Sequence, residues 1–182
     1  MTPVATSPVS FLADVRRLPR KGMAVRIEAD ERQRGALAAE HGLLAVESFV
    51  ADLLVRPWKS EGVRVEGSVA ARIVQACAVT LDPVDARIDE EVEALFVPEG
   101  SRLARPRGTV EGEILLDPEG PDAPETFAGD TIDVGALAEE FFGLAIDPYP
   151  RAPGAPAETA AVSVGDKEAS PFAKLLSLKP KS

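Results

Sequence analysis

The chain has 182 residues, of which 45% are hydrophobic and 27% are charged, and its net charge is −10. This composition is typical of a globular protein, and the length favours one domain with tails over two full domains. The sequence holds one cysteine, Cys77, and one histidine, His41. An intramolecular disulfide is therefore excluded, and so is a zinc site built from cysteine and histidine alone.

We therefore expect no metal and no other cofactor. A single cysteine agrees with a reducing compartment. The N-terminus lacks the basic and apolar regions of a secretory signal, and no stretch approaches the roughly 20 apolar residues of a membrane helix. We predict a soluble, cytoplasmic protein that does not contact a membrane.

The negative charge is concentrated in the middle of the chain. Residues 82–147 hold 4 Lys and Arg against 18 Asp and Glu, whereas residues 1–81 and 148–182 each carry a net charge of +2. An acidic region repels phosphate backbones and attracts basic partners at low salt. Solubility alone is an equally good explanation of the same charge.

The N-terminal part predicts two short strands and a helix. Residues 10–15 and 23–28 are expected strands, the second because apolar and polar side chains alternate along it. Asp30 predicts a helix N-cap, because Gln33 follows three residues later in the capping-box pattern. The expected helix covers residues 31–41, and Gly42 is well placed to end it.

The firmest structural prediction is a long antiparallel hairpin. Residues 43–55 and 62–81 are expected strands, and Gly67 predicts a bend in the second. Asp82–Pro83 is a turn signal, after which the alternation of side chains resumes. The apolar positions that predict one buried face are Val63, Val65, Val69, Ala71, Ile73, Cys77, Val79 and Leu81 before the turn, and Val84, Ala86, Ile88, Val92, Ala94 and Phe96 after it.

The rest of the chain predicts an irregular excursion, a second helix and a tail. Residues 98–124 are rich in Pro, Gly and charge, with one short strand expected at 113–117. Asp133 is expected to cap a helix whose apolar face, at helical spacing, is formed by Val134, Leu137, Ala138, Phe141, Leu144 and Ala145. Pro148 is expected to end it.

Together these elements predict an α+β fold. We expect a strongly bent antiparallel sheet, or a partly closed barrel, with a long hairpin and two helices. Residues 1–148 are expected to form this single domain. Residues 149–182 are expected to form a flexible tail, with a linker rich in Pro, Ala and Gly and a short C-terminal motif.

Few residues point to catalysis. His41, beside Gly42 at the end of a helix, is expected to be exposed or to bond a helix terminus. Cys77 is expected to be a packed core thiol whose burial raises its pKa. Glu139 and Glu140 are expected on a solvated helix surface, without the desolvating pocket that separates carboxylate pKa values. No phosphate-binding glycine loop is present, and we predict neither enzymatic activity nor a small-molecule substrate.

Basic residues are too few for autonomous RNA binding. A local phosphate contact is the most that they predict. The candidate residues for such a contact are Arg16, Arg17, Arg20 and Lys21, with Arg56 and Lys59 beside Trp58.

Three stretches resemble the YceD family. Residues 75–84 (QACAVTLDPV) resemble its C-x-x-(C/T)-L-x-P-V turn, with Thr80 where the common form has a second cysteine. Residues 130–150 are similar to its D-L-x-x-L-x-E-E-L-x-L-x-x-P-x-x-P helix, and Ser170–Leu176 resembles the N-P-F-A-x-L that closes many members. The family-motif positions are Cys77, Leu81 and Pro83 in the turn, and Asp133, Leu137, Glu139, Glu140 and Pro148 in the helix and after it.

The resemblance implies a non-catalytic factor for accumulation of 23S ribosomal RNA, and hence for biogenesis of the large ribosomal subunit. Any metal-dependent role of cysteine-richer members does not transfer, because Cys77 stands alone. We expect the protein to bind a precursor particle or a basic ribosomal protein, and to contact 23S ribosomal RNA indirectly. The residues expected to bind the partner are Asp85, Asp89, Glu91 and Glu93 after the turn, and Phe172, Leu175 and Leu176 in the C-terminal motif.

Alternatives stay open at this point. An RNA-processing or remodelling enzyme would require an acid–base pair, and an acidic accessory subunit of an unrelated complex fits the charge equally well. The turn at residues 77–84 either fixes the hairpin register or docks on a partner. The C-terminal motif binds either its own domain or a partner.

Overall fold

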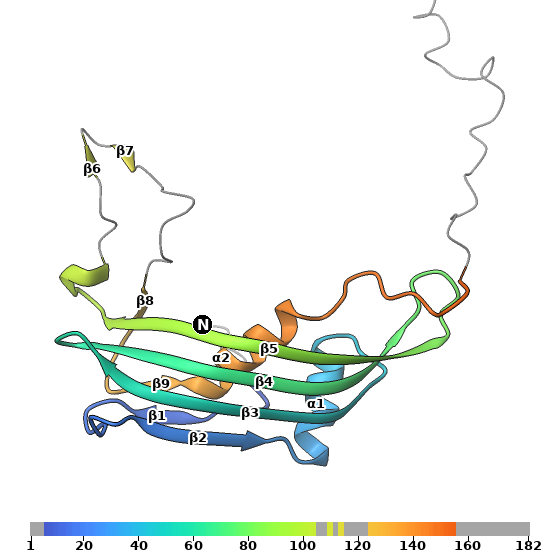
Figure 1. Cartoon of the computed structure of the whole chain (residues 1–182), viewed down its shortest axis with the longest axis horizontal. Coiled ribbons are helices and arrows are strands. Elements are labelled where there is room, and N and C mark those ends of the chain that lie inside the picture. Colours follow the sequence, from blue (N-terminus) through green and yellow to red (C-terminus); the bar gives the residue numbers. More distant parts are fainter. Residues whose placement is uncertain (1–5, 105–108, 111–112, 115–123, 156–182) are drawn as a thin grey trace, which may run out of the picture.

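The computed structural model describes residues 6–104, 109–110, 113–114 and 124–155 of the chain. Two α-helices, a short 3₁₀ helix and nine strands are found in these ranges (Figure 1). In chain order the elements are β1 (Leu12–Asp14), β2 (Met23–Glu28), α1 (Glu31–Glu40), β3 (Ala45–Trp58), β4 (Gly62–Ala76), β5 (Pro83–Pro98), η1 (Arg102–Ala104), β6 (Thr109–Val110), β7 (Glu113–Ile114), β8 (Glu125–Phe127), β9 (Thr131–Asp133) and α2 (Val134–Leu144).

The main sheet has five strands in the order β2–β3–β4–β5–β8. Strands β2 to β5 are antiparallel neighbours, and β8 pairs in parallel with the last residues of β5. The long strands bend strongly (Figure 1), but β2 and β8 do not pair with each other, so the sheet is not closed into a barrel. The predicted α+β class and the strongly bent sheet are confirmed. Two further pairs, β1–β9 and β6–β7, form small separate sheets.

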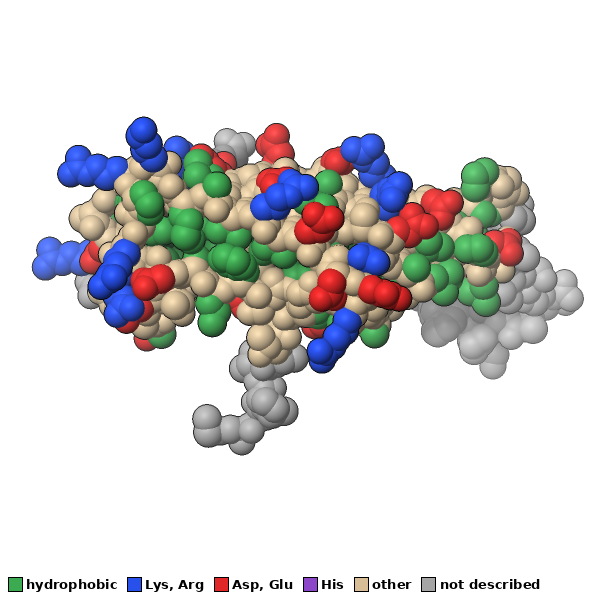
Figure 2. Space-filling model, turned by 90° about the horizontal axis from the view of Figure 1, so that it is seen from below, with side chains coloured by type: hydrophobic (Ala, Val, Ile, Leu, Met, Phe, Trp, Pro, Cys, Tyr) green, Lys and Arg blue, Asp and Glu red, His purple; other side chains and the backbone are tan. Residues whose placement is uncertain are grey.

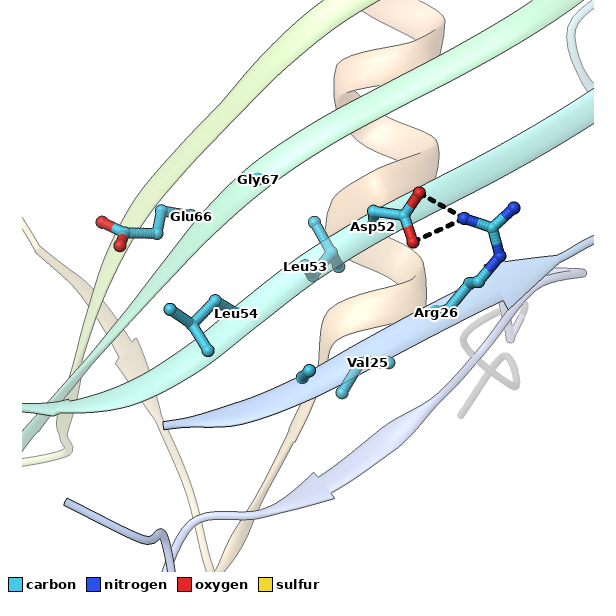
Figure 3. Close-up of a pocket in the computed structure, with 8 residues that line it drawn as sticks. Val25, Arg26, Asp52, Leu53, Leu54, Glu66 and Gly67 are labelled. Carbon is cyan, nitrogen blue, oxygen red and sulfur yellow. Dashed lines mark hydrogen bonds and ion pairs between the residues drawn. The ribbon is translucent and has the colours of Figure 1, made fainter. Parts of the chain in front are cut away.

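One face of the main sheet forms the core together with both helices and the β1–β9 pair. Along each long strand, buried residues alternate with exposed or half-buried ones, as the period of a strand requires. Phe49 of β3 meets Phe142 of α2 edge to face, with ring centroids 5.5 Å apart. In Figure 3 α2 accordingly lies behind the strands, on the face opposite to the charged side chains drawn there.

The predicted hairpin of β4 and β5 is confirmed, and its register runs from Val63 opposite Phe96 to Ala76 opposite Pro83. We call Cys77–Asp82, which join the two strands, the hairpin tip. The prediction that Leu81 shares the buried face was wrong. Its backbone N–H donates to the carbonyl of Cys77 at 3.0 Å, its φ is 63°, and its side chain is 75% exposed. The strand alternation therefore ends at Ala76, five residues earlier than predicted.

At Gly67 the backbones of β3 and β4 leave no room for a side chain. Gly67 lies opposite Leu53 of β3, and a Cβ atom at this position would stand 2.0 Å from the carbonyl oxygen of Asp52. Any side chain at this position would therefore force the two strands apart. The register shift of the β3–β4 pair lies between Val46 and Ser48, so the bend predicted at Gly67 stays a prediction.

Both predicted helices form, with the predicted caps. The Asp30 carboxylate accepts a hydrogen bond from Gln33 N at 2.8 Å, and the Gln33 side chain accepts one from Asp30 N at 2.9 Å. Gly42, with φ of +64°, follows α1. The apolar face of α2 was predicted with one error. Leu144 is 77% exposed, and the fully buried side chain of this last turn is Phe142. In the described part of the chain, no helix is both long and apolar enough to span a bilayer.

Candidate functional site

The second face of the main sheet, opposite to the helices, carries the charged side chains and is called the open face (Figure 3). The Arg26 guanidinium of β2 contacts both carboxylate oxygens of Asp52 on β3, at 2.8 and 2.5 Å. Beside this pair and Gly67 lies a shallow depression, which Leu54 and Glu66 also line. Because the charges at its wall already pair with each other or with neighbouring strands, it has no free group to hold a ligand.

Arginines neutralise most of the acidic residues on this face. Arg64 of β4 contacts Glu93 at 2.7 Å and Glu66 at 3.1 Å, and Arg87 of β5 contacts Asp89 at 2.6 Å. Arg56 likewise contacts Glu66 at 2.8 Å. The Arg64–Glu93 and Arg56–Glu66 pairs cross strands, whereas the other two lie within one strand. Ion pairs at a sheet surface stabilise it only modestly when they are exposed.

The four carboxylates predicted to bind a partner lie where the alternation placed them. Asp85, Asp89, Glu91 and Glu93 are all exposed on the open face of β5. Asp89 and Glu93 are paired with arginines, whereas the described residues offer Asp85 and Glu91 no ion pair. Unpaired acidic charge on the open face of β5 is therefore confined to fewer residues than the sequence pattern indicated. The other predicted partner-binding residues, Phe172, Leu175 and Leu176, lie outside the described residues.

The structure brings the first two family-motif stretches together at the hairpin tip. Ala78 N donates to the carbonyl of Pro150 at 2.8 Å, and the Gln75 side chain donates to the carbonyl of Asp147 at 2.8 Å. The segment that follows α2 therefore runs along the end of β4 and the tip (Figure 1). Pro83 begins β5, a position where its missing N–H costs no ladder hydrogen bond. Pro148 is exposed and does not end α2 as predicted, because the helix already ends at Leu144, with Ala145 as its C-cap.

Cys77 is buried, as predicted, but the predicted direction of its pKa was wrong. The Ala152 N–H, 3.4 Å from the sulfur, and the groups of Thr80 and Val79 donate hydrogen bonds that lower the pKa of Cys77 to about 6. These donors outweigh the opposing effect of burial. These hydrogen bonds order the tip, and because Cys77 is 0% exposed its sulfur is not presented as a reactive nucleophile.

Asp133 joins the start of α2 to the strand β1. Its carboxylate accepts hydrogen bonds from Gly135 N and Ala136 N in the helix, and from Phe11 N and the Ser10 hydroxyl beside β1. Burial alone would raise the pKa of this carboxyl, but the four hydrogen bonds lower it below its usual value. The predicted N-cap is confirmed, and Leu137, one turn later, is buried in the core.

The next two motif residues of α2 have different surroundings. Glu139 is 8% exposed and contacts His41 Nε2 at 3.1 Å, whereas Glu140 is exposed. The predictions of a solvated Glu139 and of an exposed or cap-bonding His41 ring were therefore wrong. The ring of His41 also packs edge to face on Phe142, with centroids 5.2 Å apart. Burial raises the pKa of Glu125 in β8, and the nearby charge of Glu140 raises it further.

The His41–Glu139 pair links the end of α1 to α2, and sequence reasoning missed it because the partners are 98 positions apart. A histidine and a carboxylate are two members of a nucleophilic triad, but catalysis also needs a nucleophile and space for a substrate beside them. The ring lies against Phe142 and beside Gly143, so its surroundings are packed side chain and helix. This arrangement orients α1 on α2.

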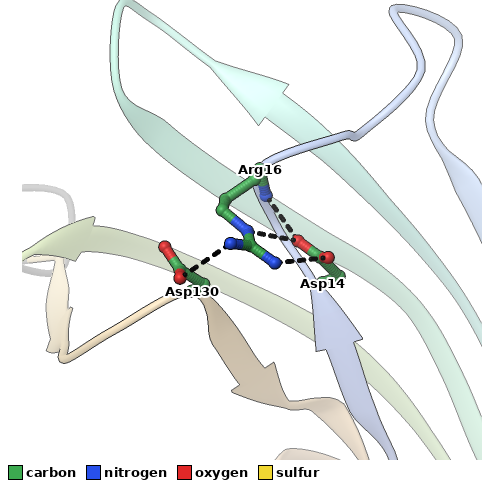
Figure 4. A network of polar contacts seen from close by, with 3 residues as sticks. All are labelled: Asp14, Arg16 and Asp130. Atoms are coloured by element: carbon green, nitrogen blue, oxygen red, sulfur yellow. Dashed lines mark hydrogen bonds and ion pairs between the residues drawn. The ribbon is translucent and has the colours of Figure 1, made fainter.

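The basic residues predicted near the N-terminus are partly used within the fold. Arg16 lies between Asp14 of β1 and Asp130, contacting their carboxylates at 3.3 and 3.2 Å (Figure 4). Its hydrogen bond to Asp14 raises the pKa of Arg16 and lowers that of Asp14. Arg16 therefore fastens the β1–β9 pair, and its charge is not free for a phosphate group.

The described ranges contain no group of three or more His, Cys, Asp or Glu side chains arranged to hold a metal ion.

Fold and surfaces together define an α+β protein with a covered sheet face, a charged open face and a braced hairpin tip. Residues 65–179 match the family model described as "Large ribosomal RNA subunit accumulation protein YceD". Because this match covers more than half of the chain, the protein belongs to the YceD family. The family's description gives it a role in accumulation of the large-subunit ribosomal RNA. No match was found among curated proteins, nor among solved structures.

Proposed function

We propose that the protein is a non-catalytic binding factor in biogenesis of the large ribosomal subunit, and that it binds a basic ribosomal protein on a precursor particle. Its family supports the first part. The observation that carries the second is the acidic open face of β5, where Asp85 and Glu91 are exposed and have no ion pair among the described residues.

The position of β5 in the sheet supports this proposal. β8 pairs only with Phe96–Pro98, so the acidic part of β5 has no neighbouring strand on its outer side among the described residues. A partner can therefore approach both the carboxylates and the strand edge. An acidic surface accelerates association with a basic protein and disfavours a phosphate backbone. Contact with 23S ribosomal RNA is, in this proposal, made through the partner.

The C-terminal motif extends the proposal. Phe172, Leu175 and Leu176 form an apolar group in a sequence rich in lysine, joined to the domain by residues 149–169. A second contact on the same particle would raise the overall affinity through effective concentration, without any change in the first contact.

Co-purification tests the proposed function. The full-length tagged protein is isolated from cells at low and at high salt, and the bound RNA and proteins are identified. We expect large-subunit precursor RNA together with ribosomal proteins at low salt and loss of both at high salt, because exposed charges are screened. We expect little binding to purified 23S ribosomal RNA alone. Recovery of neither RNA nor ribosomal proteins at low salt would contradict the proposal.

A further inference from the structure

The hairpin tip and its flank are more apolar than a strand connection usually is. Turns are commonly built from Gly, Pro, Asn, Asp and Ser. Here Ala78, Leu81 and Pro83 are the exposed apolar positions, with Asp82 between the last two. Leu81 is 75% exposed. The position of Pro83 at the start of β5 explains its presence, but no local structural role explains an exposed leucine in this turn.

Leu81 is also held in a backbone conformation that leucine disfavours. Its φ of 63° lies in the left-handed region, where the side chain is crowded by its own backbone and where glycine is the ordinary residue. Strain of this kind persists only where the surrounding structure fixes it, and it concentrates at functional positions.

The surrounding structure does fix the tip. Leu81 N donates to Cys77 O at 3.0 Å, and Cys77 N donates to Asp82 O at 2.8 Å, which closes the turn on itself. From the side, Ala152 N contacts the Cys77 sulfur at 3.4 Å, so the chain after α2 braces the turn. The exposed leucine is thus presented on a rigid support and is not the end of a loose loop.

The exposed residues near Leu81 are mainly apolar and acidic, with Arg151 as a basic residue in the bracing segment. Tyr149, which is 75% exposed, directly precedes Pro150, whose carbonyl accepts the hydrogen bond of Ala78 in the tip. Asp82 and Asp85 are exposed on either side of Pro83. Figure 2 shows apolar side chains beside acidic ones at this end of the molecule. Such a surface matches an apolar pocket bordered by basic side chains and repels the phosphates of RNA.

We infer that Leu81 is the apolar anchor of a protein–protein contact, and that the hairpin tip inserts it into a pocket of a basic large-subunit protein. The class of this partner rests on the proposed function. A few side chains that fill well-packed pockets near the centre of an interface carry most of its binding energy, and the charged residues around them set rate and specificity. The tip supplies the anchor, and Asp82 and Asp85 supply the charged border.

The backbone conformation of Leu81 makes a clean test available. Leu81→Gly removes the side chain and relieves the strained φ. If the side chain makes no contact within its own chain, this substitution leaves the stability unchanged or raises it. The matched control is Lys59→Gly. Lys59 has φ of 54° and is, with Leu81, one of the two non-glycine residues of positive φ in the described part of the chain. It lies in the β3–β4 turn, at the other end of β4, and its ammonium group lies 3.9 Å from the Trp58 ring centre.

The experiment titrates full-length wild-type protein, Leu81→Gly and Lys59→Gly against total protein extracted from purified large ribosomal subunits, with the captured proteins identified and quantified. Thermal unfolding of each variant is measured in parallel. We expect Leu81→Gly to weaken capture of a basic protein by about tenfold or more, the effect of losing one buried leucine, while its Tm stays level or rises. Lys59→Gly should capture as the wild type does.

Three outcomes would overturn the inference, and they separate it from the proposed function. Equal, salt-sensitive capture by all three proteins would agree with the proposed function but would show that Leu81 is not part of the contact. A lower Tm for Leu81→Gly would mean that Leu81 packs against its own chain, residues 156–182 included. Capture of no basic protein even by the wild type would defeat both proposals.

Discussion

At the scale of single residues, Asp133 shows how one carboxylate fixes two elements. Its oxygens accept hydrogen bonds from the first turn of α2 and from Phe11 and Ser10 beside β1. Asp133→Asn keeps the shape of the side chain and removes the charge that strengthens these bonds. We expect the free energy of unfolding to fall by about 1–2 kcal/mol at neutral pH, because hydrogen bonds to a charged acceptor are stronger than those to a neutral amide.

The pH dependence of that loss follows from the lowered pKa of Asp133. A carboxyl whose folded pKa lies below its unfolded value of about 3.9 stabilises the fold fully above about pH 4. This contribution is lost as the pH falls through the folded pKa. Urea unfolding of wild type and Asp133→Asn should therefore differ most at neutral pH and converge in acid, with Asp85→Asn as an exposed control. A difference that is the same at pH 7 and pH 3 would contradict this explanation.

At the scale of elements, the close approach of β3 and β4 at Gly67 makes a steric prediction. A Cβ at residue 67 would lie 2.0 Å from the Asp52 carbonyl oxygen and 2.9 Å from the Leu53 Cα, both of which belong to the backbone. Gly67→Ala must separate two central strands. We therefore expect the free energy of unfolding to fall by roughly 3–5 kcal/mol, in the range of severe core changes.

Gly35 provides the matched control for this prediction. It lies within α1, where a Cβ would meet nothing within 4 Å. Gly35→Ala should raise the stability by about 0.5–1 kcal/mol, the difference in helix propensity. Thermal or urea unfolding compares the two variants with the wild type. If Gly67→Ala were as stable as the wild type, β3 and β4 would have more room at this point than the backbone distances allow.

The elements that local patterns specify were predictable, and the contacts between distant residues were not. Alternation placed β2 and the β4–β5 hairpin, and the spacing of Asp30 and Gln33 placed the start of α1, because these signals lie within a few residues. The surroundings of Cys77 depend on Ala152, and those of His41 depend on Glu139, and no local pattern pairs such residues. For the same reason the four acidic positions of β5 were predictable, but the pairing of Glu93 with Arg64 of β4 was not.

At the scale of the whole molecule, the charge is polarised along the sheet. The end that carries the β3–β4 turn gathers basic side chains (Figure 2), and Lys59 lies in that turn. Met23 pairs with Val55 near the end of β3, which brings the loop before β2, with Arg20 and Lys21, toward that turn. The opposite end carries the hairpin tip with Asp82 and Asp85. A basic partner is therefore steered toward the tip end, and its orientation is selected before contact.

This polarity predicts that the position of a charge matters more than the net charge. Asp85→Asn with Glu91→Gln and, as control, Glu40→Gln with Glu99→Gln each change the net charge from −10 to −8. All four residues are exposed, but only the first pair lies on the open face of β5. The association rate with the captured basic protein should fall several-fold for the β5 variant at low salt, and much less for the control, because steering acts over about one Debye length. The two rates should converge near 1 M salt, where that length is about 3 Å. Equal slowing by both variants would show that only the net charge affects the association rate. The acidic open face of β5 would then not be the surface that binds the partner.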